Sequence, residues 1–193
     1  MGPVEREKWN DRYARRVVAP ELDPAPWLVE NLRLARQGRA LDLASGLGDQ
    51  ALYLAYQGWQ VEAIDISEVG LARARQRERR AGLRVAWIVA DLTTFVLPSD
   101  RYDLITCFYY LQREGLAEQI GRALRPGGIL IFETFTHDQL AMPDSQIKNP
   151  EHTLRPGELL RLFPGLRVRR YRDELLDGRA VAGLVAEKPV LLT

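Results

Sequence analysis

The sequence has little of what several classes of protein depend on. Cys107 is the only cysteine in 193 residues, which excludes an internal disulfide and argues against a cysteine-ligated metal site. The two histidines fall short of the ligand density of a zinc site, so we expect no metal. No apolar run approaches about 18 residues, and the charged N-terminal segment lacks the apolar core of a secretory signal. These absences predict a cytoplasmic protein without a membrane span.

A strong overall charge is also missing, because the net charge is only +1. Arginine is nevertheless concentrated in residues 72–84, "ARARQRERRAGLR". We interpret this stretch as the solvated face of a surface helix, with an RNA-binding patch as the alternative. RNA sites commonly add exposed aromatic rings, whereas the nearby Trp87 lies in a strand pattern, so a nucleic-acid partner is not expected. The arginines are Arg73, Arg75, Arg77, Arg79, Arg80 and Arg84.

Strand patterns alternate with helical patterns through the middle of the chain. Ser67 suits the N-cap of the arginine-rich helix, and Gly82 suits its end. Such alternation predicts an α/β fold with a doubly wound, mostly parallel sheet and helices on both faces. The expected strands span residues 39–44, 60–66, 83–92, 101–111 and 129–135. The expected helices span residues 49–57, 68–81 and 114–124, the last closed by a turn at "RPGG".

The pattern changes after Phe135. Residues 136–153 are polar and contain prolines, and they are too many for a plain connector, so we expect a lid or binding loop. A short helix at 156–163 follows, and then two alternating runs, 166–176 and 179–188, are separated by "DG". That dipeptide is a strong hairpin signal, so the sheet is expected to finish in an antiparallel β-hairpin.

The N-terminal residues 1–38 are expected to form a helical cap on a main domain of residues 39–193. Helical patterns at 9–15 and 27–36 flank the proline-rich "PELDPAP" at 20–26. A cap joined in this way suits a ligand site beneath it. We expect one domain overall, as a monomer or a homodimer.

The loop "ASGLGD" (44–49) follows the first strand and predicts a ligand site. Gly46 and Gly48 let the backbone approach a ligand because no Cβ intervenes. Asp65 ends the second strand, where a carboxylate can accept hydrogen bonds from both hydroxyls of a ribose. Gly46, Gly48 and Ala51 also fit the spacing of a dinucleotide site, so an NAD(P)-dependent oxidoreductase is an alternative.

Three further features favour a sulfonium nucleoside over a dinucleotide. Asp42, inside the first strand, can order the loop or meet a cationic ligand, whereas it would repel a pyrophosphate. Asp91, which ends the third strand, could accept a hydrogen bond from an adenine amine. The fourth strand ends in Phe108, Tyr109 and Tyr110, and aromatic faces attract cations.

The ordered segments "LDLASGLGDQALYLA", "VEAIDIS", "WIVADL", "YDLITCFYYL" and "LRPGGILIFETF" resemble the motif series of class I S-adenosylmethionine-dependent methyltransferases. The opening "KWNDRYA" and closing "PGELLRLFPGLRVRRYRDE" are similar to the tellurite-resistance-type branch. The resemblance implies a Rossmann-like seven-stranded sheet of order 3-2-1-4-5-7-6, with the seventh strand antiparallel. It also implies methyl transfer from S-adenosylmethionine to a small-molecule acceptor by in-line displacement, leaving S-adenosylhomocysteine. A non-catalytic protein that binds S-adenosylmethionine is a second alternative.

The resemblance assigns cofactor contacts residue by residue. It places the loop around the methionine part, Asp65 on the ribose, Ile66 on the adenine face, and Asp91 with Leu92 on the adenine edge. The family usually has glycine at Ala44 and cysteine at Ser45, and a methyl group at Ala44 is tolerated if φ is negative there. The expected cofactor site comprises Trp9, Arg12, Tyr13, Asp42, Ala44, Ser45, Gly46, Gly48, Asp65, Ile66, Asp91, Leu92 and Cys107.

Several of these residues also have simpler interpretations. Cys107 suits a buried small apolar side chain better than a reactive thiol. Trp9 and Tyr13 could make a helix contact instead of capping the site. A catalytic base cannot be assigned, since His137 and His152 suit loop solvation as well as catalysis. The expected acceptor contacts are Phe108, Tyr109, Tyr110 and His137.

Overall fold

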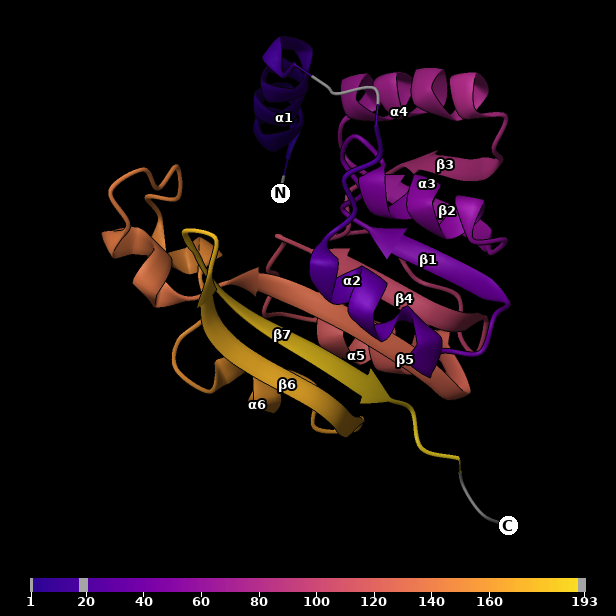
Figure 1. Cartoon of the computed structure of the whole chain (residues 1–193), viewed down its shortest axis with the longest axis vertical. Helices are drawn as coiled ribbons and strands as arrows, with labels where there is room; N and C mark the ends of the chain where they lie inside the picture. Colours follow the sequence, from indigo (N-terminus) through magenta and orange to yellow (C-terminus); the bar gives the residue numbers. More distant parts are fainter. Residues whose placement is uncertain (1, 18–20, 191–193) are drawn as a thin grey trace.

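A seven-stranded sheet forms the centre of the computed structural model, which describes residues 2–17 and 21–190 (Figure 1). Its strand order is β3-β2-β1-β4-β5-β7-β6. Neighbouring strands from β3 through to β5 pair in parallel, and β7 runs antiparallel to β5 and β6. The predicted sheet order and C-terminal hairpin are therefore confirmed. The strands are β1 (Arg39–Leu43), β2 (Gln60–Asp65), β3 (Val85–Val89), β4 (Tyr102–Phe108), β5 (Leu124–Phe135), β6 (Arg167–Leu176) and β7 (Arg179–Glu187).

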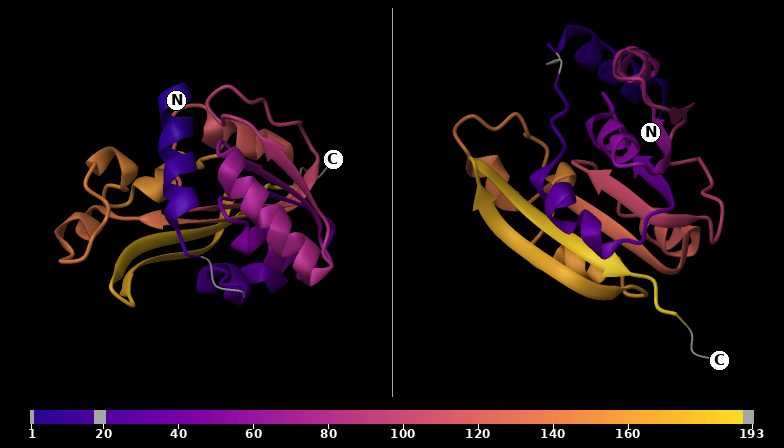
Figure 2. Two further views of the ribbon diagram at one scale, coloured as in Figure 1. Left: turned by 90° about the horizontal axis from the view of Figure 1, so that it is seen from above. Right: turned by 45° about the vertical axis from the view of Figure 1, so that its right-hand side comes forward.

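Helices cover both faces of the sheet, so the sheet separates two apolar clusters (Figures 1 and 2). Leu41 and Leu43 of β1 join one cluster and Ala40 the other, because successive strand residues point to opposite faces. Helices α5 and α6 pack in the first cluster, and α2 and α3 pack in the second. The α-helices are α1 (Pro3–Arg15), α2 (Pro26–Asn31), α3 (Asp49–Tyr56), α4 (Glu68–Ala81), α5 (Leu116–Ala123) and α6 (Glu158–Leu162). None of the described helices is long and apolar enough to cross a bilayer.

Local sequence signals account for the ends of α4 and for the hairpin. The Gly70 amide donates to the Ser67 hydroxyl at 3.0 Å, and Gly82 ends α4 with φ of 66°. Asp177 and Gly178 have φ of 48° and 75°, the two positive angles that a type I′ hairpin turn requires. These predictions are confirmed.

The start of β5 differs from the expectation of a turn at "RPGG". Tyr102 of β4 pairs with Leu124, and the next pairing joins Leu104 to Ile129, so the intervening residues bulge out of the ladder. Gly127 allows the bulge with φ of 79°, and its amide donates to the carbonyl of Lys188. The strand therefore begins directly after α5, and the expected turn is part of it.

The long loop after β5 contains two short 3-10 helices, η2 (His137–Ala141) and η3 (Pro150–His152). Its ends meet in a bridge between Thr136 and Leu154, where the His137 amide donates to the Leu154 carbonyl at 2.9 Å. Its role as a lid stays a prediction.

Helices α1 and α2 form in the N-terminal residues where helices were expected, whereas the division into a cap of residues 1–38 and a main domain stays a prediction. Pro20 of the proline-rich stretch lies outside the described residues. Helix α1 packs against α4, since the Ser67 hydroxyl donates to Asn10 at 2.6 Å and Arg73 donates to the Tyr13 carbonyl (Figure 2). Helix α2 and the short η1 (Leu32–Leu34) follow on the second face of the sheet.

The arginine-rich helix α4 is only partly a solvated face. Arg79 and Arg80 in its last turn, and Arg84 just after it, are exposed, as expected. Arg77, however, is 9% exposed and points inward. Its guanidinium donates to the carbonyls of Leu47 and Glu21, each at 3.0 Å, and to the Asp49 carboxylate at 2.7 Å. The expectation of solvation is wrong for Arg77, because carbonyl and carboxylate acceptors replace water there.

We expect the Arg77→Gln substitution to lower the free energy of unfolding by about 2–3 kcal/mol, since it leaves Asp49 and two carbonyls without their donor. Arg80→Gln is the matched control on the exposed face and should change the stability by less than about 0.5 kcal/mol. Urea unfolding of both variants measures the difference. Equal stabilities would contradict the structural role of Arg77.

Candidate functional site

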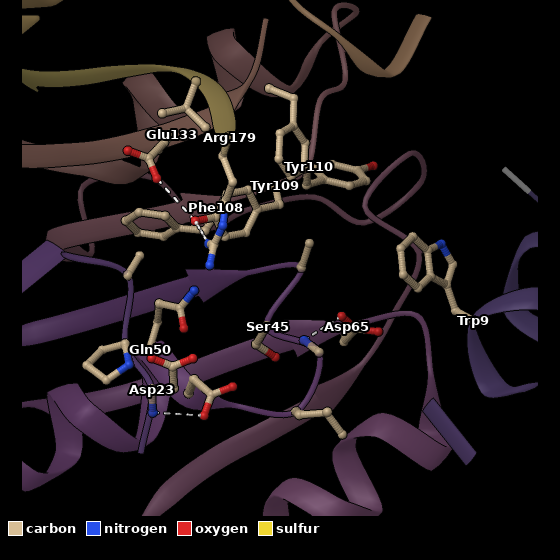
Figure 3. Close-up of a pocket in the computed structure, with 18 of the residues that line it drawn as sticks. Trp9, Asp23, Ser45, Gln50, Asp65, Phe108, Tyr109, Tyr110, Glu133 and Arg179 are labelled. Atoms are coloured by element: carbon tan, nitrogen blue, oxygen red, sulfur yellow. Dashed lines mark hydrogen bonds between the residues drawn. The ribbon is translucent and has the colours of Figure 1, made fainter. Parts of the chain in front are cut away.

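A cavity of about 720 Å³ opens at the carboxyl ends of β1, β2, β4 and β5 (Figure 3). Helix α1 borders one side, and the segment before α2 together with the β6–β7 hairpin borders the other. This is the edge where ligands bind in open α/β sheets. The lining includes Trp9, Tyr13, Asp23, Ala44, Ser45, Gly46, Gln50, Asp65, Ile66, Asp91, Leu92, Phe108, Tyr109, Tyr110, Glu133, Phe135, Arg172, Asp177 and Arg179.

The loop after β1 brings bare backbone to the cavity. Gly46 has φ of 54°, and a Cβ there would lie 2.6 Å from the Tyr13 hydroxyl, so only glycine fits under α1. The Gly48 amide donates to the Ser45 carbonyl at 2.8 Å, which closes the loop into a turn. Ala44 also has a positive φ, 54°, so the condition under which its methyl group would be tolerated is not met.

Asp65 joins this loop to the end of β2. Its carboxylate accepts from the Gly46 amide at 2.7 Å and from the Ser67 amide at 2.8 Å. Burial raises the pKa of Asp65, and hydrogen bonds from the backbone amides of Ser67, Gly46 and Ile66 act against that rise. A carboxylate has about four lone-pair positions, so acceptor capacity remains for a ligand in the cavity.

Asp91 lies beyond the end of β3 on the same cavity. One carboxylate oxygen accepts from the amide and the hydroxyl of Thr93, at 2.9 and 2.7 Å. Partial burial works to raise the pKa of Asp91, but these hydrogen bonds hold it below its usual value. The apolar side chains of Ile66 and Leu92 line the cavity beside the two acids.

Asp42 lies beneath the loop and does not line the cavity. It is 2% exposed, and the Thr106 hydroxyl donates to it at 2.8 Å. Burial raises the pKa of Asp42 to about 7, and the Thr106 hydrogen bond opposes the shift. Its neighbour Asp65 raises the pKa further by charge repulsion. Asp42 therefore lies inside the sheet, hydrogen-bonded across to β4, and not at the wall of the cavity.

Helix α1 closes the cavity with aromatic rings. Trp9 and Tyr13 stack with centroids 5.5 Å apart, and the Arg12 guanidinium lies 5.0 Å from the Trp9 ring. All three residues line the cavity. The two rings contact each other and also line the cavity, and their contact with a cofactor stays a prediction.

Tyr109 dominates the opposite wall. Its ring stacks on Phe135 at 5.1 Å, and its hydroxyl donates to Glu133 at 3.2 Å. Glu133 forms an ion pair with Arg172. Arg179 donates to the Tyr109 hydroxyl at 3.2 Å (Figure 3). Phe108 and Tyr110 line the cavity beside Tyr109, as expected.

Sequence reasoning missed Glu133, Arg172 and Arg179. A signal was present, since Glu133 is the one acid in the apolar run "ILIFETF". The sequence does not reveal that Arg172 is the partner of Glu133, because the two residues meet only through the strand register. In that register both align with Gly183 of β7. Gly183 has no side chain to separate them.

Four of the expected site residues, Asp42, Gly48, Cys107 and His137, do not line the cavity. Cys107 is fully buried in the core, where burial raises the pKa of its thiol, consistent with its interpretation as a small apolar side chain. The His137 ring lies 2.7 Å from the Thr153 hydroxyl and so joins the two ends of the long loop. Within residues 2–17 and 21–190, no three acidic, histidine or cysteine side chains are grouped to hold a metal ion.

Comparison with known proteins gives a consistent result. Residues 40–128 match the family described as "Methyltransferase domain". A demethylmenaquinone methyltransferase from Thermus thermophilus is 32% identical over 130 residues, which cover 64% of this chain and 54% of that protein. A trans-aconitate 2-methyltransferase from Variovorax paradoxus is 30% identical over 152 residues, covering 76% and 54%. The chain thus spans about half the length of these curated relatives.

Solved structures show the same fold at lower identity. The crystal structure of TehB from Haemophilus influenzae has a TM-score of 0.69 at 19% identity, covering 95% of this chain and 67% of that one. This likeness supports the architecture of the sheet.

We expect Ala44→Gly to stabilise the protein by about 1 kcal/mol, because glycine adopts the positive φ at this position without the clash of a Cβ. Thermal unfolding should show a higher Tm for the variant. Ala51→Gly, inside α3, is the matched control and should lower the Tm. A lower Tm for Ala44→Gly would contradict the inference that the positive φ strains the backbone at Ala44.

We expect Asp42→Asn to change how stability depends on pH. The raised pKa means that the folded wild type binds a proton that the unfolded chain releases above about pH 4. The contribution of Asp42 to the stability of the fold is therefore fully present below the pKa that Asp42 has in the unfolded chain. It is lost as the pH rises through about 7. We expect the free energy of unfolding of the variant, relative to that of wild type, to be higher at pH 8 than at pH 5, and urea unfolding at the two pH values measures it. Parallel pH profiles would contradict the shift.

Proposed function

We propose that this chain, which belongs to the class I S-adenosylmethionine-dependent methyltransferase family, transfers a methyl group to a small-molecule acceptor. Relatives named for small-molecule methylation support this proposal. The cavity at the strand ends carries it, because two acids and a bare loop face one space beside an aromatic wall. The dinucleotide alternative, which the loop spacing alone left open, has no comparable support.

The residues of the cavity fit S-adenosylmethionine. The Ser45 hydroxyl is buried and has no hydrogen-bond partner in the described part of the chain, so a ligand group could satisfy it. The lining carries seven acidic and four basic side chains, which suits a cofactor whose sulfonium and ammonium outweigh its one carboxylate. Gly46 lines the cavity with bare backbone, and its missing Cβ leaves room for Tyr13 of α1.

We assign the ribose to Asp65, because its carboxylate lines the cavity and can accept from hydroxyl donors. Asp91 is assigned to the adenine amine, and Ile66 with Leu92 to the faces of the base. Ala44, Ser45 and Gly46 would surround the methionine part, with Asp42 and Gly48 supporting the loop from behind. Trp9, Arg12 and Tyr13 would cover the cofactor from α1.

When bound, S-adenosylmethionine supplies a methyl group on a sulfonium whose leaving group is neutral. The chain therefore needs chiefly to align the acceptor and keep water out, and both can supply much of the acceleration. The stacked Trp9 and Tyr13 exclude water from one side of the cavity. Tyr109 and its hydrogen-bond partners would orient the acceptor on the other side of the cavity. This orientation is important because the nucleophile, the methyl carbon and the sulfur must lie in line.

Calorimetry with S-adenosylhomocysteine and with NADH tests the proposal, and only the former is expected to bind. Asp65→Asn should weaken binding of S-adenosylhomocysteine by about tenfold or more, because a neutral amide accepts hydroxyl donors less strongly than a carboxylate. Asp138→Asn, at an exposed position outside the cavity, is the control and should bind like wild type. Binding of NADH alone would overturn the assignment.

The same protein should form S-adenosylhomocysteine when it is offered S-adenosylmethionine with a panel of thiols, amines and phenols. Binding without turnover across the panel would favour a protein that senses the nucleoside.

A further inference from the structure

Tyr109 is held in a conformation that its side chain disfavours. Its φ is 57°, which is uncommon for a bulky residue and costs free energy that the surroundings must supply. The Tyr109 amide donates to the Glu133 carbonyl at 2.8 Å, and the ring stacks on Phe135. These contacts fix the phenol at the wall of the cavity, with its hydroxyl between Glu133 and Arg179.

The charge of Glu133 is already balanced by Arg172. Glu133 is 2% exposed, and both Nε and Nη2 of Arg172 donate to the same carboxylate oxygen. The Trp27 ring lies 4.4 Å from the Arg172 guanidinium and helps to shield the pair from water. The carboxylate of Glu133 therefore binds Arg172 and Tyr109 and does not form an ion pair with a second cation.

Arg179 is the second cation. It begins β7, and its side chain reaches down to the Tyr109 hydroxyl on the wall of the cavity (Figure 3). That single donor contact leaves most of its five N–H groups without a partner among the described residues. Asp177 and Glu30 also line the cavity, but neither comes within ion-pair distance of Arg179.

We propose that Arg179 recognises a carboxylate on the methyl acceptor, so that the substrate class is a small carboxylic acid with an apolar body. A planar guanidinium with free parallel donors binds a carboxylate through two hydrogen bonds, and Tyr109 fixes its orientation. Phe108, Tyr110 and Val181 line the cavity and would contact the apolar body. The inference rests on the proposed function, because it takes the space beside the cofactor to be the acceptor site.

Binding of matched acid and amide probes to the protein saturated with S-adenosylhomocysteine tests the inference. Benzoate with benzamide, and phenylacetate with phenylacetamide, differ in charge at nearly constant shape. Saturation-transfer NMR titrations should give Kd values about tenfold lower for the acids, as a charge-assisted pair predicts. Arg179→Gln should abolish the difference, and Arg179→Lys should keep part of it.

Arg167→Gln is the matched control, because Arg167 is an exposed arginine of the same hairpin that does not line the cavity. This variant should keep the full preference for acids. Equal binding of acids and amides, no binding of either, or an unchanged preference in Arg179→Gln would overturn the inference. Failure of S-adenosylhomocysteine to bind, measured first by calorimetry, would instead overturn the proposed function.

Discussion

The hydrogen bond from the Gly46 amide to the Asp65 carboxylate holds the ligand side of the structure in place. It ties the loop after β1 to the end of β2, and the Ser67 amide brings the start of α4 to the same carboxylate. A buried carboxylate is costly unless donors satisfy it, and here the backbone itself provides them. Asp65 therefore links the loop to α4, and through α4 to α1, together with Arg77, which binds the loop carbonyl of Leu47 from α4.

Much of the fold could be predicted because its signals are local. Ser67 and Gly82 mark the ends of α4 by their own hydrogen bonding and backbone freedom, and "DG" marks the hairpin. The sheet order came from the resemblance of the ordered motifs, since no local pattern specifies which strands are neighbours. Asp65 and Asp91 could be placed on one cavity because both lie at the carboxyl ends of parallel strands, which meet at one edge of the sheet.

The remaining features depend on contacts between distant parts of the chain. Arg77 looks like one more exposed arginine until Leu47 and Asp49 are folded against it. Glu133 and Arg172 meet across Gly183 only when β6 and β7 have the correct register. The bulge in β5 likewise results from pairing with β4, which overrides the turn propensity of a proline and two glycines. Composition and spacing carry no information about such partners.

The hydroxyl of Ser67 has two roles that a substitution would separate. As an acceptor it caps α4 at the Gly70 amide, and as a donor it binds Asn10 of α1. Aspartate caps helices equally well but has no proton to give, so it would keep the helix cap while Asn10 would have to turn its amide nitrogen toward the new carboxylate to stay bound to α4. Serine avoids this rearrangement, because one hydroxyl both ends α4 and holds α1 beside the cavity.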